Sequence, residues 1–128
     1  LGMIAPAQDY SNVLGNRWVR AEECDFVTRL MFMQQMHKTY AGTSTVCTGV
    51  ASKLPGTIVY EMARQECQAR LATFFGHPGG VIETEAKVEL DGNTWRAARA
   101  TVARTARRIM EGYVFVPSWA EHLEIAAE

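Results

Sequence analysis

The chain lacks the features that mark several large classes of protein. It has three cysteines in 128 residues, and Cys24, Cys47 and Cys67 form no CxxC pair, which argues against a disulfide framework or a zinc site. No run of about 18 apolar residues is present, so we expect no membrane span. The net charge of −1 gives no reason to expect nucleic acid or anionic lipid as a partner. The chain opens without a secretory signal pattern, and together these absences predict a cytoplasmic protein.

Familiar catalytic motifs are missing as well. The sequence contains no P-loop, no GxGxxG, no HExxH and no convincing Ser-His-Asp spacing. We therefore expect neither a metal nor a cofactor, and the sequence leaves the catalytic residues unassigned. Repeats, low-complexity tracts and linkers are also absent, and the content of 48% hydrophobic and 21% charged residues is typical of a globular protein. A single domain over residues 1–128 is the simplest organisation.

Hydrophobic periodicity predicts an α+β fold, with helices early in the chain and antiparallel strands late. The expected helices begin near Ala21, with Cys24, Val27 and Met31 on one face, and then cover residues 43–54 and 58–63. The expected strands cover residues 3–5, 71–75, 81–90 and 94–103, with Asp91-Gly92 as a hairpin turn between the last two.

The end of the chain is less regular. Residues 104–112 have helical propensity, but Glu111-Gly112 followed by the apolar residues 114–116 also suits a hairpin. Ser118 and Glu121 form a capping box for a short tail helix.

Cys47 is the most conspicuous candidate for chemistry. On a helix over residues 43–54 it shares an apolar stripe with Val46, Val50 and Leu54. A reactive thiolate needs access and either a helix N-terminus or a cationic neighbour. We therefore expect Cys47 to be buried in packing, with a catalytic thiol as the alternative.

Small polar residues stand where the first N–H groups of this helix have no backbone partner. Thr43, Ser44 and Thr45 combine hydroxyls with those N–H groups, and Gly42 allows a ligand to approach the backbone. This pattern predicts a site for a carboxylate or phosphate. The alternative is that one of the three merely caps the helix.

Two other stretches carry titratable groups. The "GHPGG" loop places His77, Pro78, Gly79 and Gly80 between strands, where an imidazole and backbone N–H groups could face a ligand; an ordinary tight turn is the alternative. His37-Lys38 is most simply a solvated loop pair.

Five arginines form a further basic set that lies on both faces of the expected strands, so we predict a solvated surface with pairing to Glu85 and Glu89. They are Arg96, Arg99, Arg104, Arg107 and Arg108.

Four stretches in this order resemble the C-terminal half of a known isomerase family, which contains the aconitate and 2-methylaconitate isomerases and the 4-oxalomesaconate tautomerases. They are "APAQDY", "HKTYAGTSTVCTGVASKLPGT", "GHPGGVI" and "RTARRIMEGYVFVP". The resemblance spans roughly residues 3–117.

The resemblance implies one half of a diaminopimelate epimerase-like two-domain fold. Each half is a curled antiparallel sheet around a central helix, here residues 43–54, and the active site lies between the halves. The helix N-terminus would bind a substrate carboxylate. Residues 77–80 match the family's "HPSG" loop, with Gly79 in place of the serine, and the "RTARR" segment would be a late strand.

Two departures follow from the same resemblance. The epimerase relatives carry a cysteine ahead of this helix, where the present chain has Ala41 and Gly42. The lysine and cysteine that move the proton in the isomerases belong to an N-terminal half, which this chain does not contain. We therefore expect the isolated chain to be inactive.

The sequence thus favours one lobe of an isomerase or tautomerase that shifts a double bond in a small tricarboxylic acid such as aconitate, methylaconitate or oxalomesaconate. The expected partners are a small polycarboxylate and either the missing N-terminal domain or a second copy of the chain. The alternative is a non-catalytic module that binds a small acid or dimerises. An epimerase-like homodimer would need a cysteine at the cleft, and none is evident.

Overall fold

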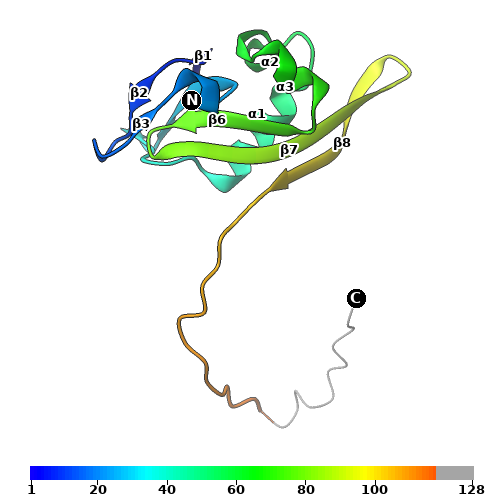
Figure 1. Ribbon diagram of the computed structural model, residues 1–128. Coiled ribbons are helices and arrows are strands. Elements are labelled where there is room, and N and C mark those ends of the chain that lie inside the picture. Colours follow the sequence, from blue (N-terminus) through cyan, green and yellow to red (C-terminus); the bar gives the residue numbers. More distant parts are fainter. Residues whose placement is uncertain (118–128) are drawn as a thin grey trace.

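The computed structural model describes residues 1–117 of the 128-residue chain. The elements are, in chain order, β1 (Gly2–Pro6), β2 (Tyr10–Ser11), β3 (Trp18–Val19), the 3₁₀ turn η1 (Ala21–Glu23), β4 (Phe26–Phe32), β5 (Gln35–Met36), α1 (Gly42–Ala51), α2 (Ile58–Met62), α3 (Gln65–Ala69), β6 (Ala72–His77), β7 (Gly80–Asp91) and β8 (Thr94–Val102). Figure 1 shows a twisted sheet with the helices beside it and a chain segment that runs away from both.

The main sheet has the strand order β1-β4-β6-β7-β8, and β5 pairs with β4. Its neighbours are antiparallel except for β4 and β6, which run parallel. Parallel neighbours need a long crossover, and here the crossover carries all three α-helices, so that α1 packs on β7 and β8. The α+β prediction, with a curled sheet around a central helix, is confirmed.

The strand β7 follows the predicted alternation at its centre, whereas β8 is exposed along most of its length. In β7, Thr84 and Ala86 are buried while Glu83 and Lys87 are exposed. The β7–β8 hairpin turns at Gly92, whose φ of 61° lies in the left-handed region that glycine adopts without strain. The predicted strand near residue 3 and the short helix near residue 58 are also present, whereas α3 was not predicted.

Aromatic side chains form the centre of the core. The rings of Phe26 and Phe75 stack with centroids 5.3 Å apart, and Tyr40 meets Phe75 edge-on at 5.1 Å. Leu30 completes this buried cluster. The cluster joins β4 and β6 to Tyr40, two residues before α1, and it therefore holds the start of the helix against the sheet.

The predicted helix at residue 21 is wrong. Only η1 is helical there, and the apolar stretch that follows is the strand β4. β4 lies between β1 and β6 and is buried on both faces along most of its length. A strand covered on both faces has apolar residues at odd and even positions alike, so its pattern no longer alternates and can be mistaken for a helical stripe.

The predicted helix over residues 43–54 is confirmed as α1, but the predicted burial of Cys47 is wrong. The thiol is exposed, and the residues that face the sheet are Thr45, Thr48 and Gly49. A Cβ at Gly49 would lie 2.6 Å from a methyl carbon of Thr84. The sheet therefore takes the face with the smallest side chains, because only that face permits so close an approach.

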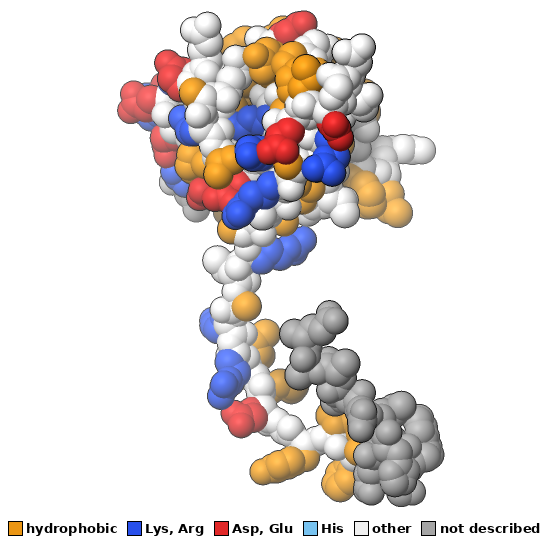
Figure 2. All heavy atoms as spheres, turned by 90° about the vertical axis from the view of Figure 1, so that its right-hand side faces the viewer, with side chains coloured by type: hydrophobic (Ala, Val, Ile, Leu, Met, Phe, Trp, Pro, Cys, Tyr) orange, Lys and Arg blue, Asp and Glu red, His pale blue; other side chains and the backbone are white. Residues whose placement is uncertain are grey.

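Residues 103–117 form neither the helix, the hairpin nor the strand considered for them. Residues 103–105 still line a cavity of the folded body, and the rest of the stretch runs away from it (Figure 1, orange). The space-filling view in Figure 2 shows apolar and basic side chains along this stretch. The capping box at Ser118 and Glu121 lies outside the described residues. Within the described part of the chain, no helix has the length and apolarity needed to cross a membrane.

Candidate functional site

A cavity of about 340 Å³ brings together three segments that are distant in sequence. Its lining includes Gly42 at the start of α1, His77 at the end of β6 and Arg104 just after β8. Tyr40 and Ile82 supply apolar wall, and none of the lining residues carries a carboxylate. The volume lies within the range common for small-molecule sites.

The N-terminus of α1 has no side-chain cap, because the N-cap residue is Ala41. The N–H and the hydroxyl of Thr45 both donate to the carbonyl of Ala41, at 2.8 and 3.0 Å, and Thr45 is fully buried. Thr43 is exposed and Ser44 half-buried, and their hydroxyls bond to nothing within residues 1–117. The first turn therefore offers unpaired N–H groups and two hydroxyls to a ligand.

His77 is the buried polar side chain of the cavity, with 8% of its surface exposed. The N–H of Gly79 donates to its Nδ1 at 3.1 Å. Burial, together with the positive charges of Arg29 and His37, lowers the pKa of His77. The ring is therefore neutral near pH 7 with its proton on Nε2, which makes Nε2–H a donor and not an acceptor.

The turn that carries His77 is held by hydrogen bonds from Tyr10. The Tyr10 hydroxyl lies 2.9 Å from the carbonyl oxygen of His77 and 2.5 Å from that of Gly80. A Cβ at Gly76 would approach the Tyr10 ring to 2.8 Å, so glycine is needed beneath it. Burial raises the pKa of Tyr10 to about 12, so the hydroxyl keeps its proton and remains a donor. Sequence analysis gave Tyr10 no role in the site, although it ends one of the four stretches behind the resemblance.

Pro78, Gly79 and Gly80 set the shape of the turn and offer few side-chain atoms to a ligand. The carbonyl of Pro78 accepts the N–H of Val13, which ties the loop to the segment between β2 and β3. Gly80 has a φ of 149°, which few other residues adopt. A Cβ at Gly79 would lie 3.1 Å from the His77 ring and 3.3 Å from the carbonyl of Lys38. A serine at position 79, as in the related loop, would therefore require a small shift of its neighbours.

All five arginines of the basic set are exposed, as predicted, and one of the two expected carboxylate pairings is present. Arg99 pairs with Glu85 at 2.7 Å, as expected, while Glu89 pairs with Lys87 instead of an arginine. Arg104 is exposed, as predicted, and it also lines the cavity next to Gly42. Its place could not be read from strand alternation, because it follows the last strand.

His37 and Lys38 lie near this region without lining the cavity. The N–H of Thr39 donates to Nδ1 of His37 at 3.1 Å, and Thr39 itself is part of the lining. Lys38 is exposed. The pair therefore shapes the loop that precedes α1, as the simpler interpretation predicted.

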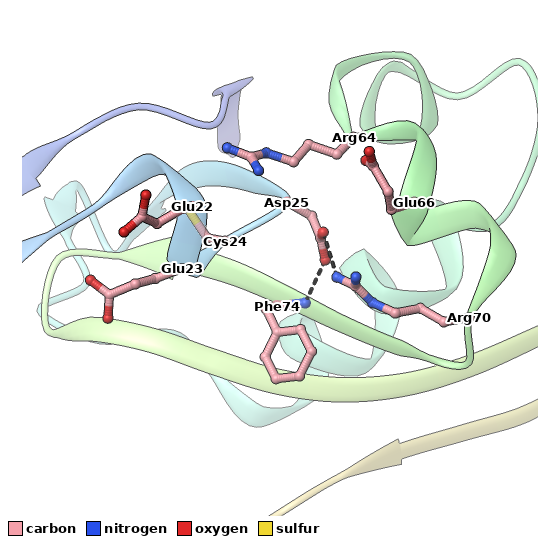
Figure 3. Close-up of a pocket in the computed structure, with 8 residues that line it drawn as sticks. All are labelled: Glu22, Glu23, Cys24, Asp25, Arg64, Glu66, Arg70 and Phe74. Atoms are coloured by element: carbon pink, nitrogen blue, oxygen red, sulfur yellow. Dashed lines mark hydrogen bonds and ion pairs between the residues drawn. The ribbon is translucent and has the colours of Figure 1, made fainter.

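A second cavity, of about 470 Å³, contains none of the predicted site residues. Figure 3 shows three glutamates, Glu22, Glu23 and Glu66, at its rim, with Asp25 between two arginines. Those arginines are already engaged: Arg70 with Asp25 at 2.5 Å, and Arg64 with the carbonyl of Ala21. The acidic lining disfavours an anionic ligand. Within the described residues no group of three or more His, Cys, Asp or Glu could hold a metal ion.

The lowered pKa of His77 predicts a loss of stability at mildly acidic pH. Between its folded pKa and its unfolded value of 6.5 the unfolded chain binds the extra proton, so the free energy of unfolding falls as pH is lowered from about 6.5. His77→Asn keeps an acceptor for the N–H of Gly79 but cannot titrate. We expect thermal melts from pH 7 to pH 5 to show a smaller drop in Tm for this variant, and an equal drop would contradict the assignment.

The comparisons with known proteins agree with one another. The family described as PrpF protein matches residues 1–117. The 3-methylitaconate isomerase of Eubacterium barkeri is 44% identical over 116 residues, and the 2-methyl-aconitate isomerase of Shewanella oneidensis is 33% identical over 117 residues. Each match covers 91% of this chain and 29% of the relative, so the chain spans less than a third of the relatives it matches.

A solved structure gives the same result. The crystal structure of a methylitaconate-delta-isomerase superposes with a TM-score of 0.73 at 39% identity, over 99% of this chain and 31% of that chain. The predicted fold, one half of a diaminopimelate epimerase-like architecture, is confirmed.

Proposed function

The chain belongs to the PrpF protein family, and on this basis we propose that it is the C-terminal lobe of a two-lobe isomerase that acts on a small unsaturated polycarboxylic acid. Residues 1–128 would form a single domain of the longer protein. The relatives carry the names of methylitaconate and methyl-aconitate isomerases. The proposed reaction moves a double bond by removing a proton next to the allylic system and returning one elsewhere on it.

The role of this lobe is to bind a substrate carboxylate. The first turn of α1 offers the N–H groups and hydroxyls of Thr43 and Ser44, and the buried Thr45 holds that turn in place through Ala41. Of the loop over residues 77–80, His77 lines the cavity, and its Nε2–H would be a further donor, while Pro78, Gly79 and Gly80 would position it. Donors fixed in this way also stabilise negative charge that spreads onto the carboxylate as the proton leaves.

The single observation that carries the proposal is the composition of the 340 Å³ cavity. An uncapped helix N-terminus, a buried neutral histidine and an arginine meet there, and no carboxylate lines it. The apolar side chains of Tyr40 and Ile82 suit the carbon skeleton of a small acid. The groups that move the proton would come from the N-terminal lobe, so the isolated chain should bind the acid without turning it over.

We expect the 128-residue chain to bind cis-aconitate, and removal of the first-turn hydroxyls in Thr43→Val/Ser44→Ala to weaken binding at least about tenfold. A hydrogen bond to a charged group contributes about 1.5–3 kcal/mol, and 1.4 kcal/mol is a factor of ten. Isothermal titration calorimetry measures the Kd. Thr94→Val, an exposed threonine at the far hairpin, is the matched control. Equal affinity of the double variant and wild type would refute the role of α1, and turnover of aconitate by the isolated chain would refute the division of labour.

A non-catalytic module that dimerises is the second candidate. Its support is the stretch from Ile109 to Val116, where Ile109, Met110, Tyr113, Val114, Phe115 and Val116 are between 63% and 100% exposed. Such a stretch suits pairing with either another lobe or a second copy of the chain. A monomeric mass in light scattering favours the first partner, and a dimer that ignores cis-aconitate favours the second candidate. Because Cys24, Cys47 and Cys67 are free, we also propose a reducing, cytoplasmic location.

A further inference from the structure

The guanidinium of Arg104 lies over the first turn of α1. A side chain on Gly42 would collide with Nη2 of Arg104 and would lie 3.4 Å from Cζ and 3.9 Å from Nε. The missing side chain of Gly42 therefore makes room for the guanidinium. Position 42 is also the first residue of α1, where the helix presents its unpaired N–H groups.

This placement is electrostatically unfavourable without a ligand. The N-terminus of a helix carries a partial positive charge, and a cation beside it is destabilising. Some arginines have carboxylate partners, among them Arg17, Arg70 and Arg99, while Arg29, Arg64, Arg96 and Arg107 have none within residues 1–117. Arg104 has none among residues 1–117, and no carboxylate lines its cavity. An anion placed between the guanidinium and the helix would be attracted by both.

A donor on the opposite wall points to the same place. His77 is more than nine-tenths buried and lines the cavity. Its Nδ1 is occupied by the N–H of Gly79, and its Nε2 has no partner within the described residues. No buried side-chain nitrogen or oxygen lacks a hydrogen-bond partner among the described residues, so this Nε2 is accessible at the surface, where a ligand can contact it. Arg104, the start of α1 and His77 thus leave donors unsatisfied around one cavity.

We propose that Arg104 is the charge-selecting ligand of this site, and that Gly42 is required because the guanidinium must lie against α1. The inference rests on the proposed function and deepens it. A guanidinium fork binds both oxygens of a carboxylate at once, while the N–H groups of α1 and the Nε2–H of His77 remain for further oxygens. The site is therefore specific for acids with at least two carboxylates, and one carboxylate alone leaves donors unpaired.

The test compares Arg104→Gln, Arg104→Lys and Gly42→Ala with Arg107→Gln in the 128-residue chain. Arg107 lies three residues after Arg104 and does not line the cavity. Arg107→Gln therefore removes the same charge outside the site. We expect Arg104→Gln to raise the Kd for cis-aconitate about 10- to 100-fold. The Kd of Arg104→Lys should lie between those of Arg104→Gln and wild type. Arg107→Gln should change the Kd less than about twofold. Titrations at fixed ionic strength remove general charge effects.

Gly42→Ala separates binding from folding. Alanine is the better helix former, so the Tm should be unchanged or higher, while the Kd rises about tenfold because the new methyl displaces Arg104. A monocarboxylate of similar size, crotonate, should bind at least about tenfold more weakly than cis-aconitate to wild type, and Arg104→Gln should narrow that ratio.

Equal losses for Arg104→Gln and Arg107→Gln would overturn the inference, since the effect would then be general attraction. A wild-type Kd in Arg104→Gln would overturn it too, and if Thr43→Val/Ser44→Ala still weakened binding, the proposed function would stand without Arg104. Absence of any binding of cis-aconitate to wild type would overturn both.

Discussion

Replacing Phe75 with alanine should lower the free energy of unfolding by about 3–5 kcal/mol. Phe75 has no exposed surface, stacks on Phe26 at 5.3 Å and meets Tyr40 edge-on at 5.1 Å. Alanine leaves a cavity at the point where β4, β6 and the approach to α1 meet. The transition monitored by circular dichroism should shift down by roughly 10–20 °C.

Phe32→Ala is the matched control, because Phe32 is 56% exposed at the end of β4. Its loss should stay below about 1 kcal/mol. The same measurement with cis-aconitate would show whether the core supports the site, since the cluster holds the residue before Gly42. Equal losses from Phe75→Ala and Phe32→Ala would mean that the core lies elsewhere.

Asp25→Ala should cost about 3 kcal/mol of stability. Asp25 is only 2% exposed, and its two oxygens accept from Nη2 of Arg70 at 2.5 Å and from the N–H of Phe74 at 2.8 Å (Figure 3). Alanine leaves a buried N–H and a guanidinium without their acceptor. Because the Arg70 side chain is 40% exposed, water can compensate in part, which places the cost at the low end of the range for buried pairs.

Two further variants separate the two bonds of Asp25. Asp25→Asn keeps an oxygen for the N–H of Phe74 and loses the charge, so we expect a smaller cost than for Asp25→Ala. A double-mutant cycle with Arg70→Leu gives the energy of the pair itself. Glu111→Ala, at an ion pair that is 80% exposed, is the control. If urea denaturation showed Asp25→Ala to be no worse than Glu111→Ala, Asp25 would have no structural role.

Elements governed by local pattern could be predicted from the sequence. β7 alternates between a buried and an exposed face at its centre, and Gly92 supplies the turn into β8. β4 was mispredicted, because burial of both its faces removes the alternation on which the prediction depends.

The site was predictable in part. Thr43, Ser44, Thr45 and the loop over residues 77–80 were chosen as binding candidates, and the structure brings the start of α1 and His77 into one cavity. Their role in binding stays a prediction. Arg104 was missed, since nothing in the local sequence distinguishes it from Arg107 or Arg108.

The sequence by itself determined the fold class, the strands β1, β6, β7 and β8, the position of α1 and the family, because each depends on periodicity, turn chemistry or ordered motifs within one stretch of chain. Only the tertiary structure decided which face of α1 is buried, which nitrogen of His77 bears the proton and where Arg104 lies. Those depend on contacts between distant segments: the sheet selects the face with Gly49, the turn directs the N–H of Gly79 to Nδ1, and the path of the chain after β8 sets Arg104 against Gly42.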